Sequence, residues 1–180
     1  MTERLFLALW PGAAQRLALA RVQGVLPLRI GRPTHPEDIH LTLVFLGPAD
    51  PEQRHCAEMA AGRVRGGPFE LTLDRVGSFP RARVLWCGAD TASPPLAALV
   101  LALRSELASC GFVLDDRPYR PHATLARKAP ALEARTLDPP IRWPVASFVL
   151  ACGQEGPPPR YRILRRWSLD GTCAIKSSAS

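Results

Sequence analysis

Lysine is scarce in this sequence: only two lysines, Lys128 and Lys176, occur among its 23 basic residues. The other basic residues are arginines, whose planar guanidinium groups match pairs of phosphate oxygens. An arginine-rich proteome gives the same bias, so composition alone leaves both explanations open. The formal net charge of +7 favours anionic partners, namely nucleic acid, nucleotides or acidic lipid.

The sequence also lacks the cysteine patterns that are typical of metal sites and disulfide frameworks. The number of cysteines is odd, no Cys-x-x-Cys pair occurs, and no cysteine lies at metal-ligand spacing from a histidine. We therefore expect free, buried thiols and a reducing, cytoplasmic location. The five cysteines stand at positions 56, 87, 110, 152 and 173.

No hydrophobic run is long enough to span a bilayer, since the most apolar segment covers only residues 94–103. The chain begins with a strand-like run rather than a basic region and an apolar segment, so we expect no secretory signal. With 180 residues, 47% of them hydrophobic, it has room for a substantial core. We expect a single domain over residues 1–172 and a flexible tail over residues 173–180.

Hydrophobic periodicity and turn residues predict a mixed order of strands and helices with short links. This order favours an α+β fold over a doubly wound parallel sheet. We expect helices over residues 13–25, 50–64 and 93–110, strands over 4–10, 39–47, 69–76, 83–88, 145–152 and 161–169 and from 122 onward, and irregular chain over 27–36 and 130–144.

One short polar pattern occurs twice in strand-like runs. His40-Leu-Thr-Leu recurs 82 positions later as His122-Ala-Thr-Leu. Residues two apart in a strand point to the same face, so each copy directs an imidazole and a hydroxyl to one side and apolar side chains to the other. The repetition predicts one site built from two similar halves.

Two histidines and two threonines in one cleft suit displacement at phosphorus. One imidazole can activate water while the other protonates the leaving oxygen, and the hydroxyls can bind the remaining phosphate oxygens. A metal is not needed, and two histidines without a nearby carboxylate or cysteines are too few ligands to favour one. The alternative is that each histidine is a structural residue of its strand, because a lone His-x-Thr is common.

The sequence resembles the 2H phosphoesterases, and most closely the RNA 2′,3′-cyclic phosphodiesterases, also called 2′-5′ RNA ligases. The resemblance covers most of the chain. It rests on Arg4-Leu-Phe-Leu-Ala-Leu, on His40-Leu-Thr-Leu-Val-Phe-Leu-Gly, on Arg117-Pro-Tyr-Arg-Pro-His-Ala-Thr-Leu-Ala-Arg, on Arg83-Val-Leu-Trp and on the strand over residues 161–169.

The resemblance implies a bilobal domain, with two pseudo-twofold-related lobes of antiparallel or mixed strands and outer helices around a central cleft. It also implies metal-free hydrolysis of an RNA 2′,3′-cyclic phosphate to a 2′-phosphate, without a cofactor, and the reverse 2′-5′ ligation. His40 becomes the proton donor, His122 the proton acceptor, Thr42 and Thr124 bind phosphate oxygens, and Arg127 pairs with the phosphate. We expect the protein to be a monomer. We expect it to bind RNA ends or nucleotides and not to bind a membrane.

Further side chains near the second motif are candidates for substrate binding. Trp86 and Tyr119 could stack on a base or belong to the core. Arg117 and Arg120 could steer RNA to the cleft or be solvated loop charges. Regular strand alternation places Arg127 on the face opposite His122, so it must reach the cleft through a twist or a strand end.

The same alternation assigns Phe45 to the core. Two other functions also fit the motifs. The cleft could bind a nucleotide or RNA end without turnover, or the enzyme could act on small cyclic nucleotides instead of RNA.

Overall fold

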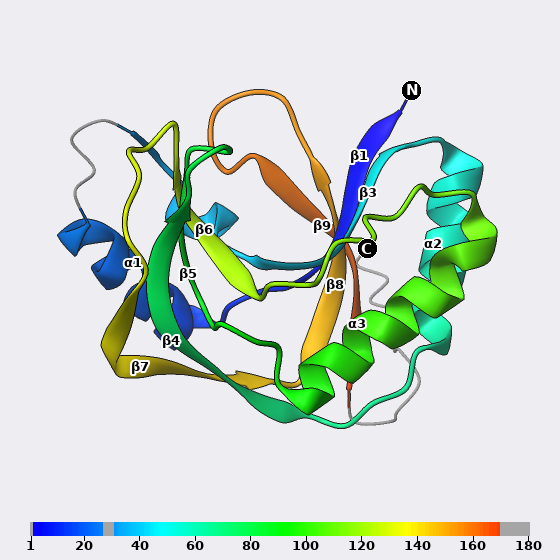
Figure 1. Cartoon of the computed structure of the whole chain (residues 1–180). Helices are drawn as coiled ribbons and strands as arrows, with labels where there is room; N and C mark the ends of the chain where they lie inside the picture. Colours follow the sequence, from blue (N-terminus) through cyan, green and yellow to red (C-terminus); the bar gives the residue numbers. More distant parts are fainter. Residues whose placement is uncertain (1, 27–30, 170–180) are drawn as a thin grey trace.

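The protein folds as three α-helices and a nine-stranded antiparallel sheet in the part that a computed structural model describes, residues 2–26 and 31–169 (Figure 1). The expected α+β class is confirmed. The strands are β1 (Glu3–Leu9), β2 (Arg32–Pro33), β3 (Leu41–Ala49), β4 (Phe69–Phe79), β5 (Val84–Gly88), β6 (His122–Arg127), β7 (Arg135–Val145), β8 (Ser147–Gly153) and β9 (Tyr161–Ser168), and the helices are α1 (Ala13–Val25), α2 (Pro51–Arg63) and α3 (Pro94–Leu107).

The two motif strands lie at the centre of the sheet. Its strand order is β7-β4-β5-β6-β3-β1-β8-β9, with the short β2 paired to β6. Strands β3 and β6 meet through a single residue pair, Leu41 with Ala123, whereas their outer neighbours pair over several residues. Apart from β2, the sheet therefore consists of two groups of four strands that join where the two histidine motifs stand.

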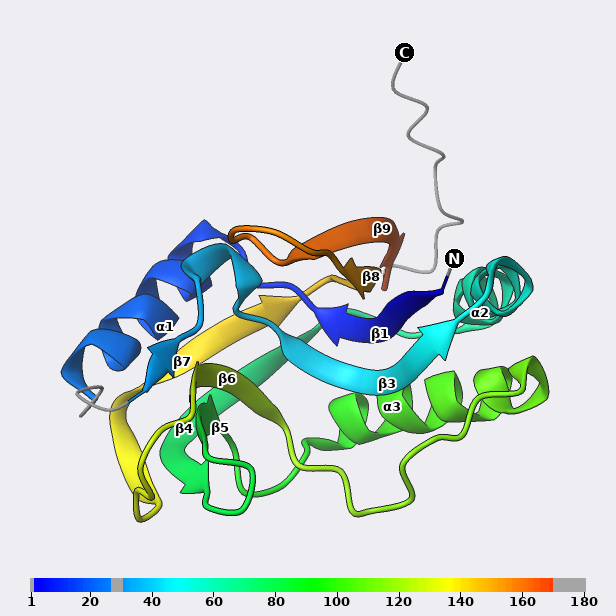
Figure 2. The ribbon, with the colours of Figure 1, turned by 90° about the horizontal axis from the view of Figure 1, so that it is seen from above.

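The helices lie at opposite ends of the molecule, with α1 packed against β6 and β7 and the adjacent pair α2 and α3 packed against β3 (Figure 2). The core between helices and sheet is formed by large apolar residues that are buried, including Leu41 and Leu43 of the first motif strand. None of the helices in the described residues is long and apolar enough to cross a membrane. The proposed tail over residues 173–180 lies outside the described residues.

Helix α2 begins where the sequence predicts. The Asp50 side chain accepts a hydrogen bond from the Gln53 backbone N–H at 2.8 Å, and the Gln53 side chain accepts from the Asp50 N–H at 3.2 Å. This reciprocal capping box satisfies two of the free N–H groups of the first turn. Ser93 occupies the corresponding position of α3, but its side chain makes no capping hydrogen bond.

The prediction of irregular chain over residues 130–144 is wrong for most of that segment. Strand β7 runs along it and pairs with β4 from Phe69↔Val145 onward. Proline cannot donate a ladder hydrogen bond, which argued against a strand, but β7 lies at the edge of the sheet, where one side of the backbone needs no partner. An edge position explains why Pro139, Pro140 and Pro144 are accepted there.

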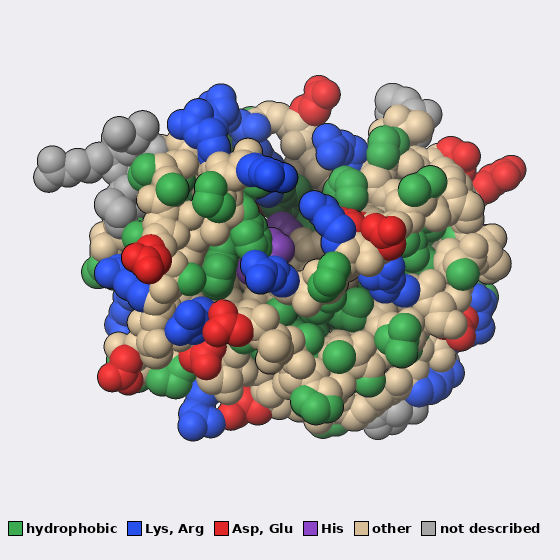
Figure 3. All heavy atoms as spheres, viewed as in Figure 1, with side chains coloured by type: hydrophobic (Ala, Val, Ile, Leu, Met, Phe, Trp, Pro, Cys, Tyr) green, Lys and Arg blue, Asp and Glu red, His purple; other side chains and the backbone are tan. Residues whose placement is uncertain are grey.

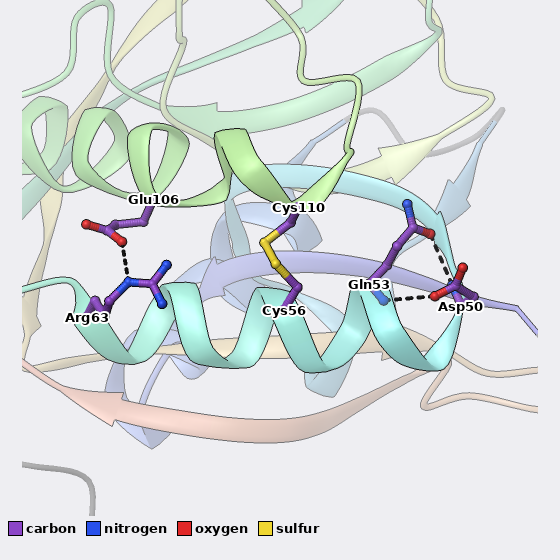
Figure 4. The surroundings of a disulfide bond; sticks show 6 residues. All are labelled: Asp50, Gln53, Cys56, Arg63, Glu106 and Cys110. Carbon is purple, nitrogen blue, oxygen red and sulfur yellow. Dashed lines mark hydrogen bonds and ion pairs between the residues drawn. A yellow bond between two sulfur atoms is a disulfide. The ribbon is translucent and has the colours of Figure 1, made fainter.

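The prediction that all cysteines are free thiols is also wrong. Cys56 of α2 and Cys110, in the short 3-10 helix η3 (Ala108–Cys110) after α3, form a disulfide (Figure 4). These cysteines are 54 residues apart in sequence, and only the packing of α2 beside α3 brings them together. The cysteine pattern therefore no longer supports a reducing compartment. Cys87 and Cys152 are free and buried, and Cys173 lies outside the described residues.

Candidate active site

The two motifs point their polar side chains to one face of the sheet, as the sequence predicts. His40 and Thr42 are half-buried, as are His122 and Thr124, whereas the residues between and after them, Leu41 and Leu43 or Ala123 and Leu125, are buried. The period of two along each strand separates a core face from an open face. Because β3 and β6 are neighbours, both open faces line one region of the molecule.

Each imidazole is fixed by the backbone two residues before it. His40 Nδ1 donates to the Asp38 carbonyl oxygen at 2.7 Å, and His122 Nδ1 donates to the Arg120 carbonyl oxygen at 2.8 Å. A carbonyl oxygen can only accept, so in both neutral rings the proton resides on Nδ1. The Nε2 atom of each ring is left to exchange a proton with a bound molecule.

A bulge follows each motif and changes which side chain reaches the open face. In β3 the pairing with β1 shifts register after Thr42, and Leu43 and Val44 are both buried. In β6 the pairing with β5 shifts between Trp86↔Thr124 and Leu85↔Ala126, and Leu125 and Ala126 are both buried. An extra residue in one strand interrupts the alternation of side chains. Residues after the bulge therefore point to the opposite face from the one that a regular strand predicts.

The bulges reverse the assignment of Phe45 and settle how Arg127 reaches the cleft. Each stands three residues after its motif threonine, on the open side of its strand. Phe45 is 49% exposed, so its assignment to the core is wrong. Arg127 is exposed and lines the same cavity as His40 and Thr42, although simple alternation turned it away. A regular strand is the assumption that failed in both cases.

The larger of two cavities lies beside His40 and has a volume of about 690 Å³. Figure 3 shows histidine side chains at the bottom of a hollow on this face, with Lys and Arg side chains around it. Aromatic and basic side chains together suit a nucleotide, since a base can stack while the phosphates meet positive charge. The cavity is lined by Thr2, Glu3, Arg4, Phe6, His40, Thr42, Phe45, Arg127, Gly153, Gln154, Glu155, Arg160 and Tyr161.

The smaller cavity lies beside His122 and has a volume of about 180 Å³. His40 and His122 thus line neighbouring hollows on the open faces of the two adjacent motif strands. Trp86 and Arg120, both candidates from the sequence, belong to this second cavity. It is lined by Ser78, Phe79, Trp86, Ala89, Asp90, Arg120, Pro121, His122 and Ala134.

The His40 ring is enclosed by aromatic side chains. It stacks on Phe6 and Trp10 with ring centroids at 4.7 and 5.2 Å, and the Tyr161 ring lies nearly perpendicular to it with centroids 5.0 Å apart. This burial lowers the pKa of His40 from 6.5 to about 4, with a further lowering by the positive charge of Arg127. The free protein therefore holds His40 neutral at pH 7.

His122 has a more open environment, with one aromatic neighbour, Phe79, whose ring lies perpendicular to it with centroids 4.9 Å apart. Burial lowers the pKa of His122 as well, and the positive charge of Arg127 acts in the same direction. Arg127 thus acts electrostatically on both imidazoles. An anion that neutralises Arg127 removes one of the forces that keep the two rings uncharged.

The remaining candidates from the sequence are placed away from the two cavities. Arg117 is exposed and pairs with Asp115 on the loop before β6. Tyr119 packs against the core, and its hydroxyl donates to the Thr42 carbonyl oxygen at 2.9 Å, which ties the second-motif loop to the first motif strand. Of the two alternatives for Tyr119, the structure favours a place in the core.

Sequence reasoning missed several lining residues, above all Phe6, Arg160 and Tyr161. Phe6 lies in an apolar run that indicates only a buried strand, and Arg160 and Tyr161 follow a proline-rich turn far along the chain. Nothing local marks them, because β1 and β9 reach the cleft only through the sheet order. No three His, Cys, Asp or Glu side chains of residues 2–26 and 31–169 are grouped so that they could hold a metal ion.

Comparison with known proteins relates this chain to enzymes that act on RNA. It is 37% identical over 172 residues to the RNA 2′,3′-cyclic phosphodiesterase of Escherichia coli, an alignment covering 93% of this chain and 97% of that one. The corresponding enzyme of Thermus thermophilus is 35% identical, covering 93% and 91% of the two chains. 

The fold agrees with solved structures of such proteins. The crystal structure of E. coli LigT complexed with 3′-AMP superposes with a TM-score of 0.86 at 34% identity, covering 94% of this chain and 99% of that one. The family model of the 2′-5′ RNA ligase superfamily matches residues 14–156, a span that contains both histidine motifs, the bulges and Arg127. On sequence and on fold alike, the chain belongs to the 2′-5′ RNA ligase superfamily.

Proposed function

We propose that this protein is an RNA 2′,3′-cyclic phosphodiesterase that opens the cyclic phosphate to a 2′-phosphate, with His40 as proton donor and His122 as proton acceptor. The observation that carries the proposal is the pair of imidazoles on neighbouring strands, each with Nδ1 held by a backbone carbonyl and Nε2 free. A binding site alone has no need for two proton-exchanging groups.

In this reaction His122 Nε2 takes a proton from water while the water oxygen attacks phosphorus. The bond from phosphorus to the 3′ oxygen breaks, and His40 Nε2 gives its proton to that oxygen. The product carries a 2′-phosphate and a 3′-hydroxyl. The attacking and leaving oxygens lie on opposite sides of phosphorus, and the two rings come from the adjacent strands β3 and β6.

Thr42, Thr124 and Arg127 are the groups that stabilise the non-bridging phosphate oxygens. The threonine hydroxyls lie on the same strand faces as the histidines, and Arg127 acts electrostatically on both rings. The substrate phosphate neutralises Arg127 and adds negative charge beside His40, and both changes favour protonation of that buried ring. Substrate binding therefore converts His40 to the protonated form in which it can act as an acid.

The larger cavity beside His40 receives the nucleoside that bears the cyclic phosphate. Phe45 is the exposed aromatic ring there, and the guanidinium of Arg4 lies 5.6 Å from its centroid. A base can stack on this pair. E. coli LigT, of similar fold, forms complexes with 3′-AMP and with ATP, which supports a nucleotide-sized ligand for this cleft.

Ligation is included in the same proposal. An RNA 5′-hydroxyl that replaces water beside His122 gives its proton to His122 and attacks phosphorus, the bond to the 3′ oxygen breaks, and His40 protonates that oxygen, which leaves a 2′-5′ bond. In the opposite direction, cleavage of that bond back to the cyclic phosphate, the two imidazoles exchange roles. We also propose that the two groups of four strands are lobes of one domain over residues 1–172, related by a pseudo-twofold axis between β3 and β6. The identical position of the bulge after each motif supports this relation.

The test is turnover of an oligonucleotide that ends in a 2′,3′-cyclic phosphate, in the presence of EDTA. We expect His40→Gln and His122→Gln to reduce kcat at least 100-fold by the loss of one proton-transfer group. His55→Gln, a change of an exposed histidine in α2, is the matched control. Binding of the oligonucleotide without opening of its end supports the binding-module alternative, and equal turnover of a cyclic mononucleotide supports the small-substrate alternative.

A further inference from the structure

Asp38 is a buried acidic side chain directly beside the first histidine. It ends the short 3-10 helix η2 (Pro36–Asp38) two residues before His40 and is only 4% exposed. Burial of a carboxylate without a cation costs several kcal/mol, so such groups are normally paired. Among the ion pairs of residues 2–26 and 31–169, none includes Asp38.

The Asp38 carboxylate instead accepts two backbone hydrogen bonds from a distant strand. The Arg160 N–H donates to its oxygens at 2.8 and 3.0 Å, and the Tyr161 N–H donates to Oδ1 at 3.2 Å. These N–H groups belong to the first residue of β9 and the residue just before it, more than 120 residues away in sequence. Asp38 therefore fixes the segment that places Arg160 and Tyr161 in the larger cavity.

The same residue also fixes the His40 ring directly. Its carbonyl oxygen accepts from His40 Nδ1, while its carboxylate holds the backbone of Tyr161, whose ring packs perpendicular to the His40 ring. The equivalent position before His122 is Arg120, which offers only its carbonyl. The two motifs thus differ in charge at one position, with an anion beside the first histidine and a cation beside the second.

We infer that Asp38 is a positioning residue, which orients His40 and the start of β9 and supplies the negative charge against which His40 carries its proton. The inference rests on the proposed function for its catalytic meaning. A carboxylate that lacks a cationic partner in the free protein gains one when His40 is protonated. The Asp38 carboxylate then acts at a distance on a positive ring, as the substrate phosphate neutralises Arg127.

The charges that face His40 act in opposite directions. Arg127 and His122, both in β6, disfavour its protonated form, and Asp38 favours it. Tyr161 from β9 and the rings of Phe6 and Trp10 contact it without a formal charge. The other charged residues at the cavity, Glu3, Arg4, Glu155 and Arg160, line its wall.

The experiment compares Asp38→Asn with the wild type by nitrogen NMR titration of His40, both free and saturated with adenosine 2′-phosphate. The asparagine Oδ1 can still accept both backbone N–H groups, so this change removes the charge and keeps the hydrogen bonds. We expect the titration midpoint of His40 to fall by about one pH unit in both states and that of His122 to stay in place. At pH 7, kcat should fall about tenfold with KM within about twofold.

Asp38→Ala separates the second role, because it also leaves the Arg160 and Tyr161 N–H groups without an acceptor. We expect this variant to add a several-fold rise in KM for the oligonucleotide, which Asp38→Asn does not show. Asp50→Asn is the matched control, since asparagine caps a helix as well as aspartate does and the residue lies at the start of α2.

An unchanged His40 midpoint in Asp38→Asn would overturn the electrostatic role, and so would an equal fall in Asp50→Asn. Equal KM values for wild type and Asp38→Ala would overturn the role in holding β9. Failure of the wild type to open a cyclic end would refute the proposed function alone, because the titration of the free protein needs no turnover.

Discussion

Acidification should unfold this protein partly through one side chain, His40. The folded state holds the ring neutral, with its pKa lowered from 6.5 to about 4 by burial among Phe6, Trp10 and Tyr161. In the unfolded chain His40 has the ordinary histidine pKa of 6.5. The unfolded chain therefore binds more protons at this residue than the folded state between pH 6.5 and 4. Stability that is present above pH 6.5 is therefore lost as the pH falls toward 4.

The expected size follows from the two pKa values. One pH unit corresponds to about 1.4 kcal/mol for a single proton, so the His40 contribution lost between pH 7 and pH 5 is about 2 kcal/mol. Urea unfolding followed by circular dichroism at both pH values measures the loss. His40→Gln removes the titrating group and retains a side chain of similar length beside the Phe6 and Trp10 rings.

The comparison of the two proteins isolates His40, because His122 and the acidic residues titrate in both. We expect the wild type to lose about 2 kcal/mol more than His40→Gln on acidification from pH 7 to 5. An equal loss in the two proteins would show that the His40 ring is not held neutral by its surroundings. The proposal that substrate binding protonates His40 would then fail as well.

Two further changes test the packing that holds the site together. Gly88→Ala places a Cβ atom in a steric clash with the Pro121 carbonyl oxygen, so β5 and β6 must separate next to His122. We expect this variant to lose turnover and to unfold at a lower urea midpoint. Gly67→Ala, whose Cβ atom would have nothing within 4 Å, should behave as wild type in both assays. Reduction of the Cys56–Cys110 disulfide should lower the free energy of unfolding by roughly 2–4 kcal/mol, because the bond closes a long loop. Dithiothreitol should leave the unfolding of Cys56→Ser unchanged, and an equal effect on that variant would refute the role of this bond.

The sequence alone determined the parts of the protein that depend on local pattern. The period of two in His40-Leu-Thr-Leu and His122-Ala-Thr-Leu was sufficient to predict two strands with polar side chains on one face, because strand geometry fixes side-chain direction at each step. The helix starting at Asp50 was predicted in the same way, since capping depends on residues within one turn.

Only the tertiary structure decided the features that depend on a neighbouring strand or helix. A bulge is a mismatch between two strands, so the turn of Phe45 and Arg127 toward the cleft could not be derived from one strand by counting. The disulfide needed α2 beside α3, and the proline-rich β7 needed the edge of the sheet.

Asp38 shows the same division at the active site. In sequence it is an acidic residue in a turn, and no periodicity distinguishes it from a solvated charge. Its burial and its hydrogen bonds to Arg160 and Tyr161 arise because β9, at one edge of the sheet, begins next to the end of η2. Local geometry determined which side chains carry the chemistry, and contacts between residues far apart in the chain decided the surroundings that set their charge.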